Sequence, residues 1–186
     1  MSDRLVSIWT SPRATIREIV DDDPRQYVIP LTVILSIAAT LASDSFFDEL
    51  DSFQDCMATI AIGVVVGIIA LYAFSALFCF IGNLLGGYAT FQEVRTVYAW
   101  SSIPNICAYP AVFLLSLIDD QSPLIYCLGS FVVVLSLWSL VIWIVGLSEV
   151  SSFSIWQALL ATIIGWLTIA VLLGCIVFLL INATTR

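Results

Sequence analysis

Five long apolar stretches occupy most of this chain of 186 residues, and they constrain its fold more than any other feature. They cover about residues 24–42, 56–82, 103–118, 124–147 and 156–181. An α-helix needs about 20 apolar residues to cross the hydrocarbon core of a bilayer. A helix also satisfies its own backbone hydrogen bonds there. The pattern therefore predicts an all-α polytopic membrane bundle of five transmembrane helices, with short interfacial amphipathic helices.

The composition removes most of the chemistry that enzymes use. The chain is 61% hydrophobic and 11% charged, with a mean hydropathy of +1.07, whereas soluble domains carry about 25% charged residues. All six basic residues are arginine, and histidine is absent, which excludes the usual general bases and Schiff-base lysines. Apart from Arg25, at the start of the first stretch, no Asp, Glu, Lys or Arg lies within the five apolar stretches. We therefore expect no enzyme, cofactor or metal, and the net charge of −8 argues against nucleic acid.

The arginines lie unevenly along the chain and predict an orientation. Four precede the body of the first stretch and one lies between the second and third, whereas loops 43–55 and 119–123 carry acids and no arginine. Because cytoplasmic loops are rich in basic residues, we expect a cytoplasmic N-terminus and an outer C-terminus. The expected location is the plasma or inner membrane, or an endomembrane in a eukaryote. The arginines are Arg4, Arg13, Arg17, Arg25, Arg95 and Arg186.

Residues 1–23 form a separate amphipathic segment. Their apolar side chains recur at helical spacing and predict a helix from about Pro12 to Val20, with Ser11 as its cap. Arg13 and Arg17 lie one turn apart on the polar side. Such a helix either lies in the lipid headgroup layer or packs on the cytoplasmic ends of the bundle. Asp23 and Pro24 are expected to cap and begin the first apolar helix.

The connection between the second and third stretches carries local structural signals. Gly86 and Gly87 are expected to end a helix in a left-handed turn. Thr90 and Glu93 have the spacing of a capping box and predict a new helix. This helix is expected to run along the cytoplasmic surface, with Arg95 at the water boundary, until Pro104 turns the chain back into the membrane.

Several residues inside the stretches have both a structural and a functional interpretation. Gly63 and Gly67 are four residues apart and favour close helix packing, either within the bundle or between copies. Asn105 lies between Pro104 and Pro110, next to Tyr109. Prolines free backbone carbonyls in a membrane helix, so Asn105 either repairs the kink or lines a cavity together with Tyr109.

The cysteines and tryptophans are expected to serve mainly in packing and at the membrane boundary. Five cysteines without Cys-x-x-Cys spacing fit a packing role, with a Cys56–Cys127 disulfide as an alternative. Trp9, Trp100 and Trp156 fall near the expected cytoplasmic boundary, as in an aromatic belt.

The order of these motifs resembles the Yip family of Rab-interacting membrane proteins, including its small prokaryotic members. The resemblance rests on residues 9–15, on Gly86–Phe91, on Pro104, and on Gly146–Ser148 ahead of Ser154 and Ala158. It implies five membrane helices and a cytoplasmic N-terminus. Eukaryotic relatives bind Rab-type GTPases and one another in vesicle traffic. Only about 23 residues precede the first stretch here, which weakens the expectation of a Rab-type partner and favours a prokaryotic-type member.

These observations predict a non-enzymatic scaffold or adaptor that binds other membrane proteins, or a second copy, or organises the bilayer. The alternative is a passive channel, permease or lipid-handling protein that uses the Pro104–Pro110 irregularity. The expected partners are membrane lipids and membrane proteins. The candidate partner-binding residues are Trp9, Pro12, Arg13, Arg17, Gly86, Gly87, Thr90, Glu93, Arg95 and Pro104.

Overall fold

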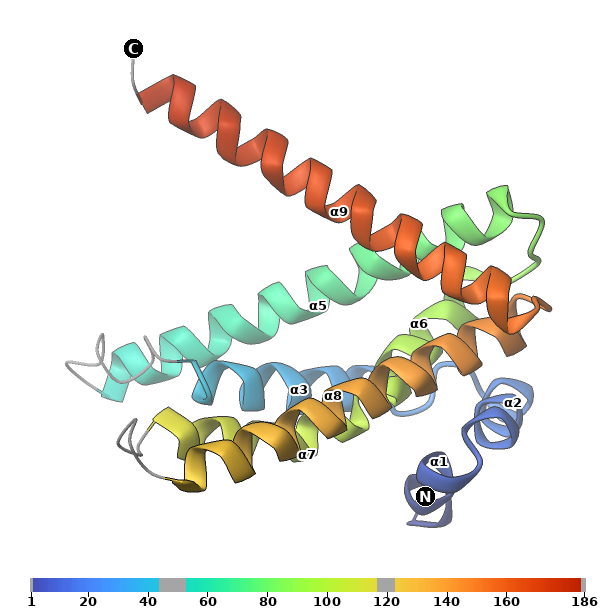
Figure 1. Ribbon diagram of the computed structural model, residues 1–186, viewed down its shortest axis with the longest axis horizontal. Helices are drawn as coiled ribbons and strands as arrows, with labels where there is room; N and C mark the ends of the chain where they lie inside the picture. The colour runs from blue at the N-terminus through green and yellow to red at the C-terminus, as the bar shows by residue number, and fades with distance from the viewer. Residues whose placement is uncertain (1, 44–52, 117–122, 185–186) are drawn as a thin grey trace.

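The computed structural model describes residues 2–43, 53–116 and 123–184, and over these ranges the chain is helical with no strand (Figure 1). The acidic loops expected on the outer side fall almost entirely outside the described residues. The helices are α1 Ser2–Thr10, α2 Pro12–Asp22, α3 Val28–Leu41, α5 Phe53–Leu84, α6 Phe91–Ser101, α7 Ile103–Ser116, α8 Pro123–Val150 and α9 Ile155–Thr184.

Three helices are long and apolar enough to cross a membrane, judged by length and composition: α5, α8 and α9. α3 and α7 have 14 residues each, so each measures about 21 Å at 1.5 Å per residue. A bilayer's hydrocarbon core is about 30 Å thick. The structure therefore confirms an all-helical fold with three full-length apolar helices over its described residues, and five transmembrane spans stay a prediction.

The N-terminal segment contains two helices, of which only α2 was predicted. Together α1 and α2 form what we call the platform, which packs on one end of the bundle (Figure 1). Ile8, Ile16 and Ile19 have no exposed surface. Gly146 of α8 makes room for this contact, because a Cβ there would lie 2.8 Å from Val97 and 3.5 Å from Ile16.

The join between the platform and α3 differs from the prediction. Asp23 does not cap α3; it is the C-cap of α2, and its Oδ1 accepts a hydrogen bond of 2.9 Å from the Arg25 backbone N–H. α3 begins only at Val28, after Tyr27 adopts a left-handed φ of 61°. The chain uses residues 23–27 to turn from the platform into the bundle, which leaves fewer residues for the helix.

α6 lies inside the bundle and not along its surface. Val94, Val97 and Trp100 are fully buried, and α6 packs against α5, α8 and α3. The polar side is covered as well, since Thr96 donates a hydrogen bond to the carbonyl of Pro24. Trp100 therefore belongs to the core, where its ring lies 6.5 Å from that of Tyr27, and the prediction that it joins an aromatic belt was wrong.

Glycines set the close contacts between the long helices. Gly63 and Gly67 of α5 face α3, where an added Cβ would come within 2.1 Å of Thr40 Oγ1 and 1.8 Å of Ser36 Oγ respectively. Gly165 of α9 is likewise covered by the ring of Phe78. Toward the C-terminus, α9 runs away from α5 and α8 (Figure 1), and beyond Gly165 its side chains are mostly exposed.

Candidate functional site

A buried carboxylate at the end of α8 holds the platform in place. Glu149 has only 9% of its side chain exposed, and it pairs with Arg13, with 2.8 Å between Oε2 and Nε, and with Arg17 through Oε1. Arg13 also donates a hydrogen bond of 3.3 Å to Ser148 Oγ. One carboxylate thus satisfies two arginines one helical turn apart. Sequence analysis did not single out Glu149, although it is the only acid between residues 124 and 155.

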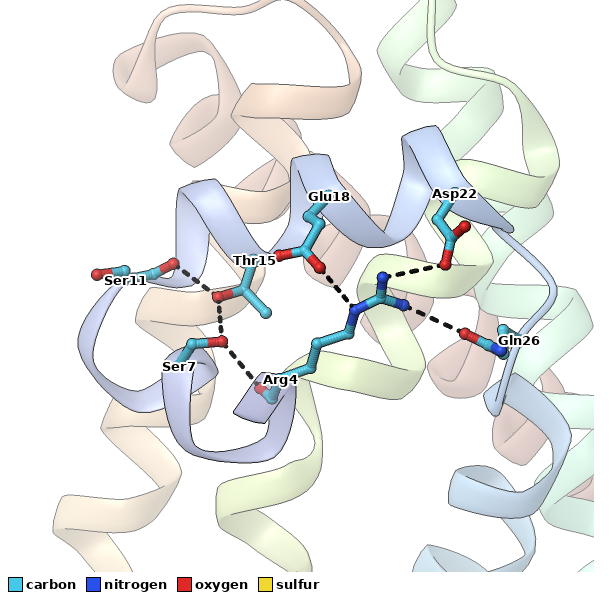
Figure 2. Close-up of polar contacts among 7 residues, drawn as sticks. All are labelled: Arg4, Ser7, Ser11, Thr15, Glu18, Asp22 and Gln26. Atoms are coloured by element: carbon cyan, nitrogen blue, oxygen red, sulfur yellow. Dashed lines mark hydrogen bonds and ion pairs between the residues drawn. The ribbon is translucent and has the colours of Figure 1, made fainter. Parts of the chain in front are cut away.

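A second network ties the two platform helices to the following turn (Figure 2). Arg4 of α1 contacts Glu18 at 2.9 Å, Asp22 at 3.0 Å and Gln26 at 3.2 Å. The hydrogen bonds to Asp22 and then to Glu18 raise the pKa of the guanidinium above its ordinary value. A single cation therefore crosslinks α1, the second half of α2 and the turn before α3.

A hydroxyl cluster joins the other ends of α1 and α2 (Figure 2). Thr15 Oγ1 lies 2.8 Å from Ser7 Oγ and 3.0 Å from the carbonyl oxygen of Ser11, and Ser7 Oγ donates to the carbonyl of Arg4. Ser11 occupies the N-cap position of α2, but its side chain makes no capping hydrogen bond. Both ends of the helix pair are thus fastened, which makes the platform a single unit.

The outward side of α2 carries an open depression of about 640 Å³. Most of its side chains are exposed and both charge signs are present. The lining brings together the predicted residues Pro12, Arg13 and Arg17. The lining residues are Ser11, Pro12, Arg13, Ala14, Arg17, Glu18 and Asp21.

The motif between α5 and α6 has the local structure that was predicted. Gly86 adopts a φ of +86°, and Gly87 donates a hydrogen bond of 3.0 Å to the carbonyl of Gly82, which closes α5. Thr90 and Glu93 form a complete capping box at the start of α6. The polar atoms of Thr90 and Glu93 therefore bind each other. The motif as a whole ends α5 and begins α6.

Arg95 and Trp9, two further partner-binding candidates, are partly buried. Arg95 donates a hydrogen bond of 3.1 Å to the Tyr72 hydroxyl, and its guanidinium carbon lies 5.3 Å from the Tyr72 ring and 5.9 Å from the Phe91 ring. Its Nε is buried and has no hydrogen-bond partner among the described residues. Trp9 packs against the core beneath the platform. The Arg95 guanidinium thus contacts two aromatic rings, whereas the sequence analysis expected it at the water boundary.

A cavity of about 280 Å³ lies where α6, α7 and α8 meet α5 and α9. Pro104 stands in the first turn of α7, and Pro110 lies inside that helix. Asn105 and Tyr109 of this helix both line the cavity. Asn105 Nδ2 donates a hydrogen bond of 3.0 Å to Ser139 Oγ, which in turn donates to the carbonyl of Ser101.

The cysteines form no disulfide, and all five thiols are free. Among the described residues no group of three or more Cys, Asp or Glu side chains is arranged to hold a metal ion. The polar chemistry of the described chain is therefore concentrated in the platform, in the Glu149 ion pairs and in the cavity.

The fold and these sites define a helical integral membrane protein with a folded N-terminal platform and a polar cavity inside its bundle. The Yip1 domain family model matches residues 6–178, and the chain therefore belongs to that family. This family is generally non-enzymatic. Comparisons with curated proteins and with solved structures gave no significant match.

Proposed function

We propose that this protein is a non-enzymatic membrane adaptor, and that the platform and its depression bind partner membrane proteins on the cytoplasmic side. One observation carries the proposal: the apolar side of the platform is buried against the bundle. Ile8, Ile16 and Ile19 are fully buried. A helix that lies in the headgroup layer needs this side for the lipid. Because the bundle already occupies it, the charged side of α2 is the surface left for contacts.

Rigidity supports the same conclusion. Glu149 fixes α2 to α8, and Arg4 fixes α1 to α2. A surface held in one conformation loses less conformational entropy on binding than a flexible segment does. The exposed charges of both signs in the depression suit a partner of mixed charge, and such complementarity contributes more to specificity than to affinity.

The arginine distribution supports an orientation with the platform in the cytoplasm. In this orientation the same side of the membrane carries the turn between α5 and α6 and the turn between α8 and α9. We expect soluble domains of other membrane proteins, or a second copy of this chain, to meet the platform there.

Site-specific photo-crosslinking in cells tests the proposal. A benzoylphenylalanine at Ala14, which is exposed in the depression, is expected to give discrete protein adducts that mass spectrometry identifies. Asp21→Arg, an exposed change in the same depression, is expected to reduce those adducts at unchanged protein level. The same crosslinker at Val171, which is 63% exposed on distal α9, is the lipid-facing control. Adducts at Ala14 that contain lipid only would contradict the adaptor function.

A second candidate function is lipid or solute handling, and the cavity beside the Pro104–Pro110 helix is the observation that favours it. A layer of fully buried side chains that includes Val97, Trp100 and Leu147 lies within one helical turn of the lining residues Tyr98, Ser101 and Trp143. This layer favours lateral access from the bilayer over a pore. Reconstituted vesicles are expected to show lipid or solute transfer that Asn105→Leu reduces, and transfer equal to protein-free vesicles would refute this candidate.

A further inference from the structure

The cavity in the bundle has a polar wall with unused hydrogen-bonding capacity. The hydroxyls of Tyr98, Tyr109 and Ser136 face it but make no hydrogen bond within the part of the chain that the structure describes. Asn105 uses one amide hydrogen on Ser139, and its carbonyl oxygen accepts nothing from the described chain. These polar groups line the cavity with no hydrogen-bond partner in the described chain, so they are available to a ligand that both donates and accepts.

The walls of the cavity carry no charge. No Asp, Glu or Arg contributes to its lining. A phosphate or ammonium group inside an apolar bundle needs an opposite charge to offset its lost hydration. The lining therefore favours an uncharged polar group, such as a hydroxyl, over a charged headgroup.

Aromatic rings form a further part of the wall. Phe74 is the centre of this wall, with ring centroids 6.3 Å from Phe78, 5.7 Å from Tyr98 and 5.8 Å from Trp166. Trp143 adds a further ring, 4.9 Å from that of Phe78, and its indole N–H is already bonded to Thr162. These flat apolar surfaces suit the carbon atoms next to a polar head.

The exposure of two lining side chains points to an opening of the cavity between α8 and α9. Two of its lining residues, Leu140 and Trp166, are 40% and 53% exposed. Toward its C-terminal end, α9 diverges from α5 and α8 (Figure 1), and its distal apolar side chains are exposed. A hydrocarbon chain that leaves the cavity therefore runs directly into the space between apolar helices.

The size of the cavity limits how much of a ligand it holds. Its volume of about 280 Å³ lies near the lower end of the roughly 300–1,000 Å³ typical of small-molecule pockets. It admits a small head and the first carbons of a tail, but not a whole lipid. Flexible chains can bend from the cavity into the bilayer.

We propose that the cavity binds the free hydroxyl head of an uncharged lipid of the diacylglycerol type. Its head lies among Asn105, Tyr109 and Ser136, and its chains lie between α5, α8 and α9. The proposal is independent of the adaptor function and requires binding only, with no transport.

Photolabelling of the full chain in nanodiscs tests this binding. The probe is a diacylglycerol that carries a photoreactive diazirine near the head and an alkyne for detection. Because the diazirine lies near the head, we expect labelled peptides from α7 or α8 at the cavity. Unlabelled diacylglycerol is expected to compete, whereas its methyl ether, which lacks the donor, should compete about fivefold less well. Phosphatidic acid with the same chains should compete less well because it adds charge.

A double variant and a matched control test whether the labelling depends on the cavity. Tyr109→Phe with Ser136→Ala removes two hydroxyls that form no internal hydrogen bond within the described chain, so the fold is expected to persist while labelling falls about fivefold or more. Thr168→Val is the matched control, because its exposed hydroxyl bonds only to the Ile164 carbonyl, outside the cavity. Labelling in this control should equal that of the parent chain.

Several results would overturn the proposal. The proposal is wrong if the ether or phosphatidic acid competes as well as the alcohol, if the double variant labels as strongly as the parent, or if the label lies away from the cavity. If the double variant does not fold, the ether competition on the parent chain still decides. Asp21→Arg should leave labelling unchanged, so a failure of the adaptor function and a failure of lipid binding are separable.

Discussion

Arg13 and Glu149 form an ion pair in which Nε and Oε2 are 2.8 Å apart, and it joins the second helix of the chain to the end of α8. The Arg13 side chain is 57% exposed, whereas the Glu149 side chain is only 9% exposed. The buried partner therefore contributes most of the constraint, because solvent screens the exposed one. Arg17 contacts the second oxygen of the same carboxylate. Removal of the single carboxylate consequently breaks both contacts at once.

We expect Glu149→Gln to loosen the platform without unfolding the bundle. The glutamine keeps the shape of the side chain but has no charge to offer Arg13 and Arg17. The cost to platform docking should be about 1–2 kcal/mol, below the value for fully buried pairs because both arginines are exposed. Hydrogen exchange in α2 should accelerate accordingly, with α5 and α8 unchanged.

The control for Glu149 is Glu18→Gln. Glu18 also pairs with an arginine, at 2.9 Å, but 60% of its side chain is exposed, and Asp22 and Gln26 continue to hold Arg4. Exchange in α2 should change little in this variant. Equal acceleration in the two variants would show that burial of Glu149 is not what secures the platform.

Gly67→Ala is expected to separate α3 from α5. Its new Cβ would lie 1.8 Å from Ser36 Oγ and 2.9 Å from Ser36 Cβ, so the helices must shift. Overpacking of this kind costs about 1–3 kcal/mol. A thermal unfolding series in detergent should show the loss, and Ser36→Gly in the same chain should recover part of it as a coupling energy.

Gly174→Ala gives the matched comparison for Gly67, because an added Cβ at that position meets nothing within 4 Å. Alanine also has the higher helix propensity, by about 1 kcal/mol. The midpoint temperature of thermal unfolding of Gly174→Ala should therefore stay the same or rise. A loss as large as that of Gly67→Ala would mean that the effect comes from the helix backbone and not from the contact with Ser36.

Thr90→Ala should weaken the start of α6. It removes the side-chain oxygen that accepts from the Glu93 backbone N–H at 3.4 Å, and the hydroxyl that lies 2.8 Å from Glu93 Oε2. The expected cost is about 1 kcal/mol. Thr90→Ser retains the cap and should lie close to the parent in thermal unfolding. If alanine and serine behave alike, the capping box does not contribute to stability.

Gly86→Ala is expected to strain the turn that ends α5. The φ of +86° lies in the left-handed region, and an added Cβ meets nothing within 4 Å, so the cost is purely conformational. It should be about 1–2 kcal/mol. Asparagine tolerates the left-handed region better than alanine does. Gly86→Asn should therefore lower the midpoint temperature of unfolding less than Gly86→Ala does. A larger loss for asparagine than for alanine would contradict this explanation.

Local signals were predictable from the sequence because their partners lie within one turn. The capping box joins Thr90 to Glu93, three residues apart. Gly86 and Gly87 close α5 by donating to the carbonyls of Asn83 and Gly82 respectively. Pro104 near the start of α7 is also a local effect. Each is set by backbone geometry that a few neighbouring residues decide, whatever the remainder of the chain does.

Residues with distant partners were harder to place. Trp100 has an amphipathic neighbourhood that suits a surface helix, yet the side chains of other helices bury it completely. Glu149 is a lone acid at the end of an apolar run, and its role depends on arginines at the other end of the sequence. Asp23 has the type and position of a cap for α3, but the path from platform to bundle ends α2 there instead.

The sequence alone determined that this is a helical membrane protein, because long apolar runs with few charges have few other stable states in water or in lipid. The resemblance to the Yip family came from the order of its short motifs. It also determined where the main helices start and stop to within a few residues. Only the tertiary structure decided that α2 buries its apolar side in the bundle, that Glu149 receives both arginines, and that Asn105 and Tyr109 face one cavity. These relations arise from packing between helices, and packing depends on which distant surfaces meet.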